Sequence, residues 1–229
     1  MMEETWRETD RFICGLLVPS DPALEEALRS SAAAGLPDIQ VAPNQGMLLH
    51  LLAMAIGARR ILEVGTLGGY SAICFGRALP QGGHMVTIEA DPHHARVARQ
   101  NIASAGLADV VEVREGLAAD VLAQIGAEAT GAYDLVFIDA DKRNAPLYFA
   151  WALRLTHPGS LIVVDNVVRR GALVDAASED PDVQGMQTLM RDLGSEARVK
   201  ATAIQTVGLK GYDGFAIALV RHDVDGKAG

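Results

Sequence analysis

The chain has 229 residues, of which 49% are hydrophobic and 21% are charged. This composition is that of a globular protein and excludes intrinsic disorder as the main state. A formal net charge of −9 argues against a nucleic-acid-binding protein that works through a basic surface. Two cysteines cannot form a disulfide framework, no apolar run approaches the ~18 residues of a membrane span, and the acidic N-terminus lacks a secretory signal pattern. We therefore expect a cytoplasmic protein with no membrane or nucleic-acid partner.

The first third of the sequence predicts helices. One is expected from about Glu4 to Leu17, a second from Asp21-Pro22 to Gly35, and a third from Pro43 to Gly57. Apolar residues cover most faces of the third helix, which predicts that it is well buried. Residues 1–58 are interpreted as a helical cap.

From Arg59 onward, short apolar runs alternate with helical segments. The runs lack polar alternation, as expected for a parallel sheet covered on both faces. The expected strands are Ile61–Val64, Met85–Ile88, Val110–Val113, Leu135–Ile138 and Leu161–Val164. The expected helices are Ser71–Leu79, Pro92–Ala105, Ala118–Ile125, Asn144–Thr156 and Asp182–Leu193. Two last strands, 201–205 and 215–220, are expected to form a hairpin around Gly211–Gly214.

This alternation predicts an α/β fold with a doubly wound, mostly parallel, seven-stranded sheet. The hairpin would close the sheet with antiparallel strands at the C-terminus. We interpret residues 1–229 as a single domain, with the helical cap at 1–58 and the α/β core at 59–229.

A glycine-rich turn follows the first strand and begins the next helix, in Gly65-Thr66-Leu67-Gly68-Gly69. Its spacing differs from the dinucleotide pattern G-x-G-x-x-G, because Leu67 stands at the second glycine position. Glu63 precedes the turn and favours a ligand with a cationic centre over a pyrophosphate. Glu89 ends the second strand, where an acid can accept the hydroxyls of a ribose. Together these features favour S-adenosylmethionine, with Gly116-Leu117-Ala118 beside the adenine. The alternative is that the glycines only make a tight turn.

Oxygen-bearing side chains end the fourth and fifth strands. Asp139 follows one strand, and Asp165 and Asn166 follow the other, so we expect them to converge on one edge of the sheet. Two carboxylates and an amide form a hard oxygen site suited to Mg²⁺, Mn²⁺ or Ca²⁺. The alternative is that these aspartates cap helices. Lys142 is a candidate general base or a group that steers an anionic substrate, and Asp141 either contacts the cofactor or pairs with Lys142.

At this point the sequence resembles the cation-dependent class I O-methyltransferases, of the caffeoyl-CoA and catechol O-methyltransferase type. The resemblance extends over nearly all of the chain from about residue 38. The matching stretches are Val41–Gly46, Ile61–Ser71, Ile88–Asp91, Phe137–Lys142, Val164–Asn166 and Gly211–Gly214.

The resemblance implies a Rossmann-like methyltransferase fold and an enzyme that acts on a catechol-type small molecule. It implies that S-adenosylmethionine is bound by Val41, Glu63, Gly65, Thr66, Ser71, Glu89 and Ala118, with Asp139 close by. It also implies a divalent ion, most simply Mg²⁺, on Asp139, Asp165 and Asn166, with Lys142 as the catalytic base. A homodimer is usual among the bacterial and plant members.

One loop departs from the plant caffeoyl-CoA members. Where they have a tryptophan and an asparagine, this chain has Arg169 and Arg170. The departure argues against the plant acceptor and favours a different, anionic catechol. Two other functions share parts of the pattern: an NAD-dependent oxidoreductase of Rossmann type, against which Leu67 argues, and a non-catalytic cofactor-binding protein, against which the complete Asp139, Asp165 and Asn166 set argues.

Overall fold

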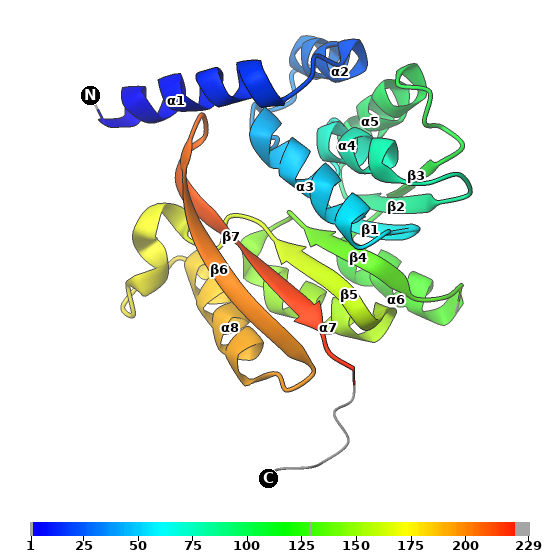
Figure 1. Cartoon of the computed structure of the whole chain (residues 1–229). Helices are drawn as coiled ribbons and strands as arrows, with labels where there is room; N and C mark the ends of the chain where they lie inside the picture. The colour runs from blue at the N-terminus through cyan, green and yellow to red at the C-terminus, as the bar shows by residue number, and fades with distance from the viewer. Residues whose placement is uncertain (1, 129, 223–229) are drawn as a thin grey trace.

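The computed structural model describes residues 2–128 and 130–222, which form a sheet covered by helices on both faces (Figure 1). The strands are β1 (Arg60–Val64), β2 (His84–Glu89), β3 (Val111–Glu115), β4 (Tyr133–Ile138), β5 (Thr156–Val164), β6 (Val199–Gly208) and β7 (Gly211–Val220). The α-helices are α1 (Met2–Leu17), α2 (Pro22–Ala33), α3 (Pro43–Ala55), α4 (Tyr70–Ala78), α5 (Pro92–Ser104), α6 (Ala118–Glu128), α7 (Ala145–Leu155) and α8 (Pro181–Ser195). Two short 3₁₀ helices are η1 (Lys142–Asn144) and η2 (Arg169–Val174).

The strand order is β3-β2-β1-β4-β5-β7-β6, with seven strands in the sheet. Strands β1 to β5 pair in parallel, and β7 pairs antiparallel with both β5 and β6. The predicted fold class and all five central strands are therefore confirmed. Because the strand order reverses at β1 and β4, the turns after these two strands flank the place where α/β sheets bind ligands.

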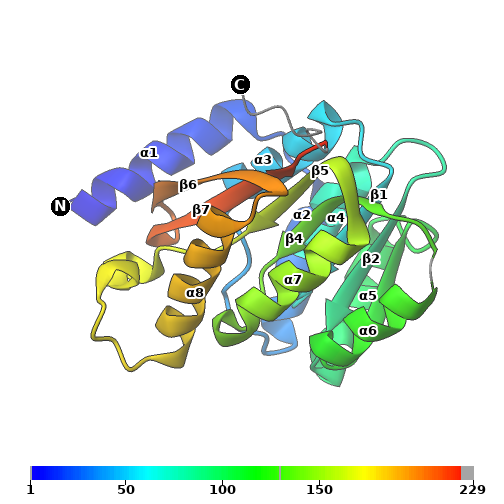
Figure 2. The same ribbon diagram turned by 90° about the horizontal axis from the view of Figure 1, so that it is seen from below.

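Two apolar clusters cover the two faces of the sheet. One joins the sheet to helices α6, α7 and α8, which lie in front of it in the view from below (Figure 2). The other joins it to α4, α5 and the cap helices α2 and α3. The strands are continuous apolar runs because both of their faces are covered in this way.

Two expectations for the fold were wrong. The hairpin does not turn at Gly211–Gly214, since β7 begins at Gly211 and the connection is Leu209-Lys210, a two-residue loop of the commonest hairpin length. Helix α3 is not buried all round: Leu51 and Met54 are 53% and 56% exposed. The apolar residues extend around more of α3 than the part that packs against the rest of the protein. An apolar strip of the helix therefore lies on the surface.

Helix α1 lies beside the hairpin and is held there by one buried carboxylate. Asp10 accepts hydrogen bonds from Asn44 Nδ2 (2.9 Å) at the start of α3 and from Leu209 N (2.8 Å) in the hairpin loop. Figures 1 and 2 both show α1 crossing the end of β6. The cap and the C-terminal hairpin are therefore joined through Asp10. No helix in the described part of the chain is long and apolar enough to cross a bilayer.

Candidate active site

A cavity of about 800 Å³ opens at the carboxyl ends of the parallel strands. Its wall includes most of the predicted site residues: Val41, Gly65, Thr66, Ser71, Glu89, Ala118, Asp139, Lys142 and Asn166. The other two predicted residues, Glu63 and Asp165, are buried and do not line it. The turns after β1, β2 and β3 and the turns after β4 and β5 thus line the same cavity.

The glycine turn brings the backbones that follow β1 and β4 into contact. Gly65 has φ 99°, and a Cβ at this position would collide with the carbonyl oxygen of Asp139. Only glycine tolerates both this backbone conformation and this approach. Leu67 lines the cavity with φ 51°, a left-handed conformation that the sequence did not reveal. Strained residues of this kind gather at functional sites.

Glu89 holds the glycine turn through its carboxylate. Its Oε2 accepts hydrogen bonds from Leu67 N (2.8 Å) and Thr66 N (3.2 Å), and its Oε1 accepts one from Asp91 N (2.9 Å). The ring nitrogen Nδ1 of His94 lies 3.8 Å from Oε1. No site role was predicted for His94, although it stands in the first turn of α5, the helix that follows Glu89.

Glu63 lies beneath the turn and is fully buried. Its Oε2 accepts a 2.6 Å hydrogen bond from the Thr87 hydroxyl, while its Oε1 finds no hydrogen-bond partner within residues 2–128 and 130–222. Burial raises the pKa of Glu63 to about 8, against the opposing effect of the Ser71 and Thr87 hydroxyls. The desolvated charged form is costly, so the protein without ligand favours the neutral acid at pH 7.

Replacing Glu63 with glutamine is expected to stabilise the ligand-free protein more as the pH rises. The folded state holds the Glu63 proton up to about pH 8, whereas the unfolded chain releases it near the ordinary value of 4.5. The wild type therefore loses stability across this range, and Glu63→Gln does not. At pH 9 we expect a gain of about 2–4 kcal/mol in the free energy of unfolding, measured with urea at pH 5, 7 and 9. Glu179→Gln, at an exposed position, is the control. A gain that is the same at all three pH values would refute the assignment.

Lys142 and Asp139 form the polar end of the cavity. Lys142 Nζ donates to Asp139 Oδ1 at 2.7 Å, and the lysine is buried to 7% exposure. The possible pairing of Asp141 with Lys142 was wrong: Asp141 instead accepts hydrogen bonds from Asn144 Nδ2 and the Tyr148 hydroxyl, both at 2.6 Å. A lysine amine thus faces the cavity beside a carboxylate from the preceding strand end.

Asp165 is held behind this end of the cavity by two hydrogen bonds. Its Oδ2 accepts from Gln45 Nε2 on α3, and its Oδ1 accepts from Asn166 N, each at 2.8 Å. Burial and the nearby Asp139 carboxylate raise the pKa of Asp165, and Lys142 opposes the shift. Asn166 adopts φ 55° and lines the cavity. The predicted convergence of the two strand ends is therefore observed, and Gln45 is a partner that the sequence did not assign.

No group of three or more His, Cys, Asp or Glu side chains among the described residues has the arrangement of a metal site. The predicted set has only two carboxylates, and its third donor would be the Asn166 amide oxygen. The half-buried Asp139 carboxylate helps to raise the pKa of the buried Asp165, and Lys142 Nζ lies 2.7 Å from Asp139 Oδ1. A further cation beside these two carboxylates would stabilise their charged forms.

Comparison with known proteins places this site in a family. Residues 18–221 match the O-methyltransferase family. The chain belongs to this family. Two relatives are named catechol O-methyltransferase. The protein from Niastella koreensis is 48% identical, and the match covers 96% of this chain and 100% of the relative. The protein from Mycobacterium tuberculosis is 51% identical, and the match covers 93% of this chain and 96% of the relative.

A solved O-methyltransferase has the same fold. The enzyme from Bacillus cereus, crystallised in complex with SAH, superposes with a TM-score of 0.95 at 53% identity and covers 96% of this chain and 100% of its own. The expected family, enzyme class and fold of this O-methyltransferase are thereby confirmed.

Proposed function

We propose that this O-methyltransferase moves a methyl group from S-adenosylmethionine to one hydroxyl of a catechol-type small molecule, with the help of a divalent cation. The observation that carries the proposal is the arrangement of one cavity. Its β1–β3 side holds the glycine turn and Glu89, and its β4–β5 side holds Asp139, Lys142 and Asn166. The names of the two catechol O-methyltransferase relatives support the acceptor class.

The β1–β3 side suits S-adenosylmethionine. Glu89 lines the cavity, and its hydrogen bond from Leu67 N keeps the carboxylate in place at the end of β2. A carboxylate at this position can accept hydrogen bonds from ribose hydroxyls. Ala118 and Leu117 supply apolar wall on the turn after β3, where the adenine would lie. Val41, Thr66 and Ser71 complete the proposed contacts, and Glu63 beneath the turn gives a carboxyl group on the side of the cationic sulfonium. The SAH in the Bacillus cereus relative supports this assignment.

The β4–β5 side suits a hard divalent ion such as Mg²⁺. Asp139, Asp165 and Asn166 would hold it through oxygen atoms, the ligands that Mg²⁺ prefers, and Mn²⁺ or Ca²⁺ share this preference. Asn166 donates its backbone N–H to Asp165 Oδ1, and its amide oxygen accepts no hydrogen bond from residues 2–128 and 130–222, so this oxygen is available to an ion. When bound, the ion supplies positive charge that favours ionisation of a nearby hydroxyl.

The residues of the chain explain how transfer would proceed. A phenolic hydroxyl ionises near pH ~10 and is a poor nucleophile at neutral pH. Lys142 Nζ, as the neutral amine, would take the hydroxyl proton, and the oxygen would then bond to the methyl carbon as the methyl–sulfur bond breaks. S-adenosylhomocysteine and the methyl ether are the products. Holding the two reactants together in one cavity contributes ~7–11 kcal/mol to such reactions in favourable cases.

The test is an incubation of the purified protein with S-adenosylmethionine, Mg²⁺ and a panel of catechols, followed by mass spectrometry. The expected product is one methylene unit heavier than the acceptor. Calorimetric titrations with S-adenosylhomocysteine and with NADH separate this function from an oxidoreductase, because only the first ligand is expected to bind. Binding of S-adenosylhomocysteine without turnover of any catechol would instead favour a non-catalytic binding protein.

Gln45 is expected to tune the metal site through Asp165. Gln45→Leu removes the hydrogen bond to Asp165 Oδ2 and leaves that oxygen buried without a donor. Partners of this kind are worth about 10–100-fold in metal affinity, so we expect Mn²⁺ to bind that much more weakly, as measured by electron paramagnetic resonance. The affinity for S-adenosylhomocysteine should stay unchanged. Gln124→Leu, exposed on α6, is the control, and equal Mn²⁺ affinity in both variants would contradict the role.

We also propose a homodimer in which a second copy covers an exposed apolar surface on α1 and β6. Phe12, Leu16 and Leu17 on α1 are about 70% exposed, and Ile204 and Val207 lie exposed on β6. β6 is the last strand of the sheet and pairs only with β7 in the described part of the chain, and proteins normally protect such an open edge. Light scattering of the wild type is expected to give twice the mass of the chain, and Phe12→Glu with Leu16→Glu is expected to give a monomer.

The chain's organisation and location complete the proposal. Cap residues Ala27, Leu49 and Ala53 share an apolar cluster with the sheet, which supports one domain over 1–229. Cys14 and Cys74 are free, which supports a cytoplasmic location.

A further inference from the structure

One arginine side chain on the wall of the cavity has a buried donor without a hydrogen-bond partner in the described residues. Arg169 stands four residues after Asp165, and its side chain lines the cavity together with Asn166 and Lys142. Its Nε atom is buried and has no hydrogen-bond partner in the described part of the chain. A buried donor without an acceptor is costly, and such atoms are found where a ligand supplies the acceptor.

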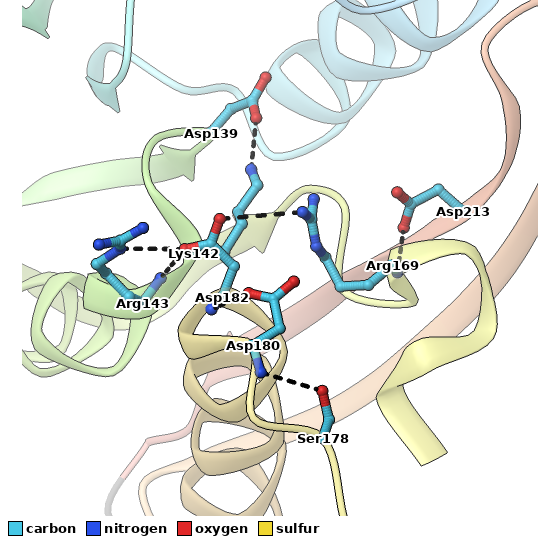
Figure 3. A network of polar contacts seen from close by, with 8 residues as sticks. All are labelled: Asp139, Lys142, Arg143, Arg169, Ser178, Asp180, Asp182 and Asp213. Carbon is cyan, nitrogen blue, oxygen red and sulfur yellow. Dashed lines mark hydrogen bonds and ion pairs between the residues drawn. The ribbon is translucent and has the colours of Figure 1, made fainter. Parts of the chain in front are cut away.

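The neighbouring carboxylate, Asp182, is already used by another residue. Its Oδ1 accepts from the backbone N (3.3 Å) and from Nε (3.2 Å) of Arg143. Arg169 Nη2 is 4.0 Å from Asp182 Oδ2, too far for a hydrogen bond. Figure 3 shows the Arg169 guanidinium beside Asp182, with this longer ion-pair contact dashed, and below the Asp139–Lys142 pair. The guanidinium therefore keeps donors for another partner.

The loop backbone fixes the position of Arg169. Asp213 Oδ1 accepts hydrogen bonds from the backbone N of Val168 (3.1 Å) and of Arg169 (3.0 Å), as Figure 3 shows for the second. Arg169 and Arg170 have φ of 53° and 55°, a left-handed conformation that residues other than glycine rarely adopt, so surrounding contacts such as those of Asp213 must hold the loop in this path. Arg169 faces the cavity, whereas Arg170 is exposed and does not line it.

Strand order tells which reactant Arg169 faces. Most of the proposed cofactor contacts follow β1, β2 and β3, whereas Arg169 follows β5, beyond β4. It thus lies on the side of the cavity that the proposed function gives to the methyl acceptor. A planar, permanently charged fork of donors matches a carboxylate in two-point contact.

We propose that Arg169 determines acceptor specificity by binding a carboxylate carried on the catechol ring or its side chain. The inference rests on the proposed function, since it names the class of catechol: an acidic one. A carboxylate is also present on the methionine part of S-adenosylmethionine, so the test must separate the acceptor from the cofactor.

The experiment measures equilibrium binding in a complex that cannot turn over. The protein is saturated with Mg²⁺ and S-adenosylhomocysteine and titrated by calorimetry with 3,4-dihydroxybenzoate, 3,4-dihydroxycinnamate, neutral catechol and the cationic dopamine. Wild type, Arg169→Gln, Arg169→Lys and Arg170→Gln are compared. Arg170→Gln is the matched control, because it removes the same charge from the same loop outside the cavity. The KM and kcat for each acceptor are measured in parallel.

We expect the wild type to bind at least one of the acids more tightly than it binds catechol. Arg169→Gln should lower the affinity for that acid by about 10- to 100-fold. Arg169→Lys should recover only part of this loss. Binding of catechol and of S-adenosylhomocysteine should stay unchanged, and Arg170→Gln should behave as the wild type.

Three results would overturn the proposal. The first is that Arg169→Gln leaves the binding of every acid unaffected, and the second is that it weakens the binding of all acceptors equally. The third is that it weakens the binding of S-adenosylhomocysteine instead, in which case the cofactor carboxylate is its partner. If the wild type methylates no catechol, the proposed function fails, but the binding series on the acids still decides the role of Arg169.

Discussion

Replacing Asp165 with alanine is expected to abolish methyl transfer to a catechol while the protein still binds S-adenosylhomocysteine. The side chain is 5% exposed and lies beside the Asp139 carboxylate, on the β5 side of the cavity away from the proposed cofactor contacts. Loss of the charge supplied by a bound ion costs several kcal/mol, which corresponds to at least about 10³-fold in kcat/KM. Product formation is measured by mass spectrometry, and cofactor binding by calorimetry.

A second variant separates loss of the metal site from loss of structure. Asp165→Asn keeps the volume of the side chain and an oxygen that can accept from Gln45 or Asn166 N, but it removes the negative charge. It should melt near the wild-type temperature and still be almost inactive. Asp109→Ala, at an exposed position, serves as the control. Excess EDTA should silence the wild type and added Mg²⁺ should restore it, so undiminished turnover in EDTA would rule out the metal role.

The sequence predicted the central sheet well because its signals are local. Runs such as Leu135–Ile138 are apolar throughout, since helices cover both faces, and each is followed by a polar or glycine-rich turn. Asp139 and Asp165 could be paired in advance for the same reason: parallel neighbours β4 and β5 end on one edge. Strand-end residues are predictable wherever the strands and their order are.

The rest of the site depends on contacts that no local pattern encodes. Gln45 contacts Asp165 across 120 positions of sequence. It lies in the matching stretch Val41–Gly46 and in a mostly apolar helix, but neither signal shows which side chain Gln45 would contact. Asp141 and Lys142 are neighbours in sequence but have different partners. Because η1 begins at Lys142, this lysine turns toward Asp139, whereas Asp141 accepts hydrogen bonds from Asn144 and Tyr148. The hairpin loop was misplaced for a similar reason: Gly211 and Gly214 look like turn residues, but the register with β6 keeps both of them within β7.

The exposed strip on α3 shows a limit of another kind. Leu51 and Met54 were expected in the core because a helix that is apolar on most faces is normally buried. They lie on the surface of this single chain, as do the apolar residues of α1. The apolar character of these side chains predicts that they are buried, but it does not show whether they pack against the same chain or against a second copy. The sequence of one chain therefore could not locate them.

Replacing Lys142 with methionine is expected to lower kcat by about 10²–10⁴-fold, the usual contribution of a positioned general base. The KM of the acceptor and the affinity for S-adenosylhomocysteine should change little, because the lysine contacts Asp139 and not the glycine turn. The deficit should shrink as the pH rises, since the catechol hydroxyl then ionises in solution near pH ~10 without help. It should also be smaller for 4-nitrocatechol, whose hydroxyl is more acidic.

Arginine at the same position distinguishes proton transfer from simple charge. Lys142→Arg keeps a cation that can pair with Asp139, but a guanidinium stays protonated and accepts no proton. A base role requires this variant to be as slow as Lys142→Met at neutral pH and to show the same recovery with pH. If Lys142→Arg instead restores most of kcat, the lysine acts by its positive charge, and the proton must leave the acceptor by a path that does not involve Nζ.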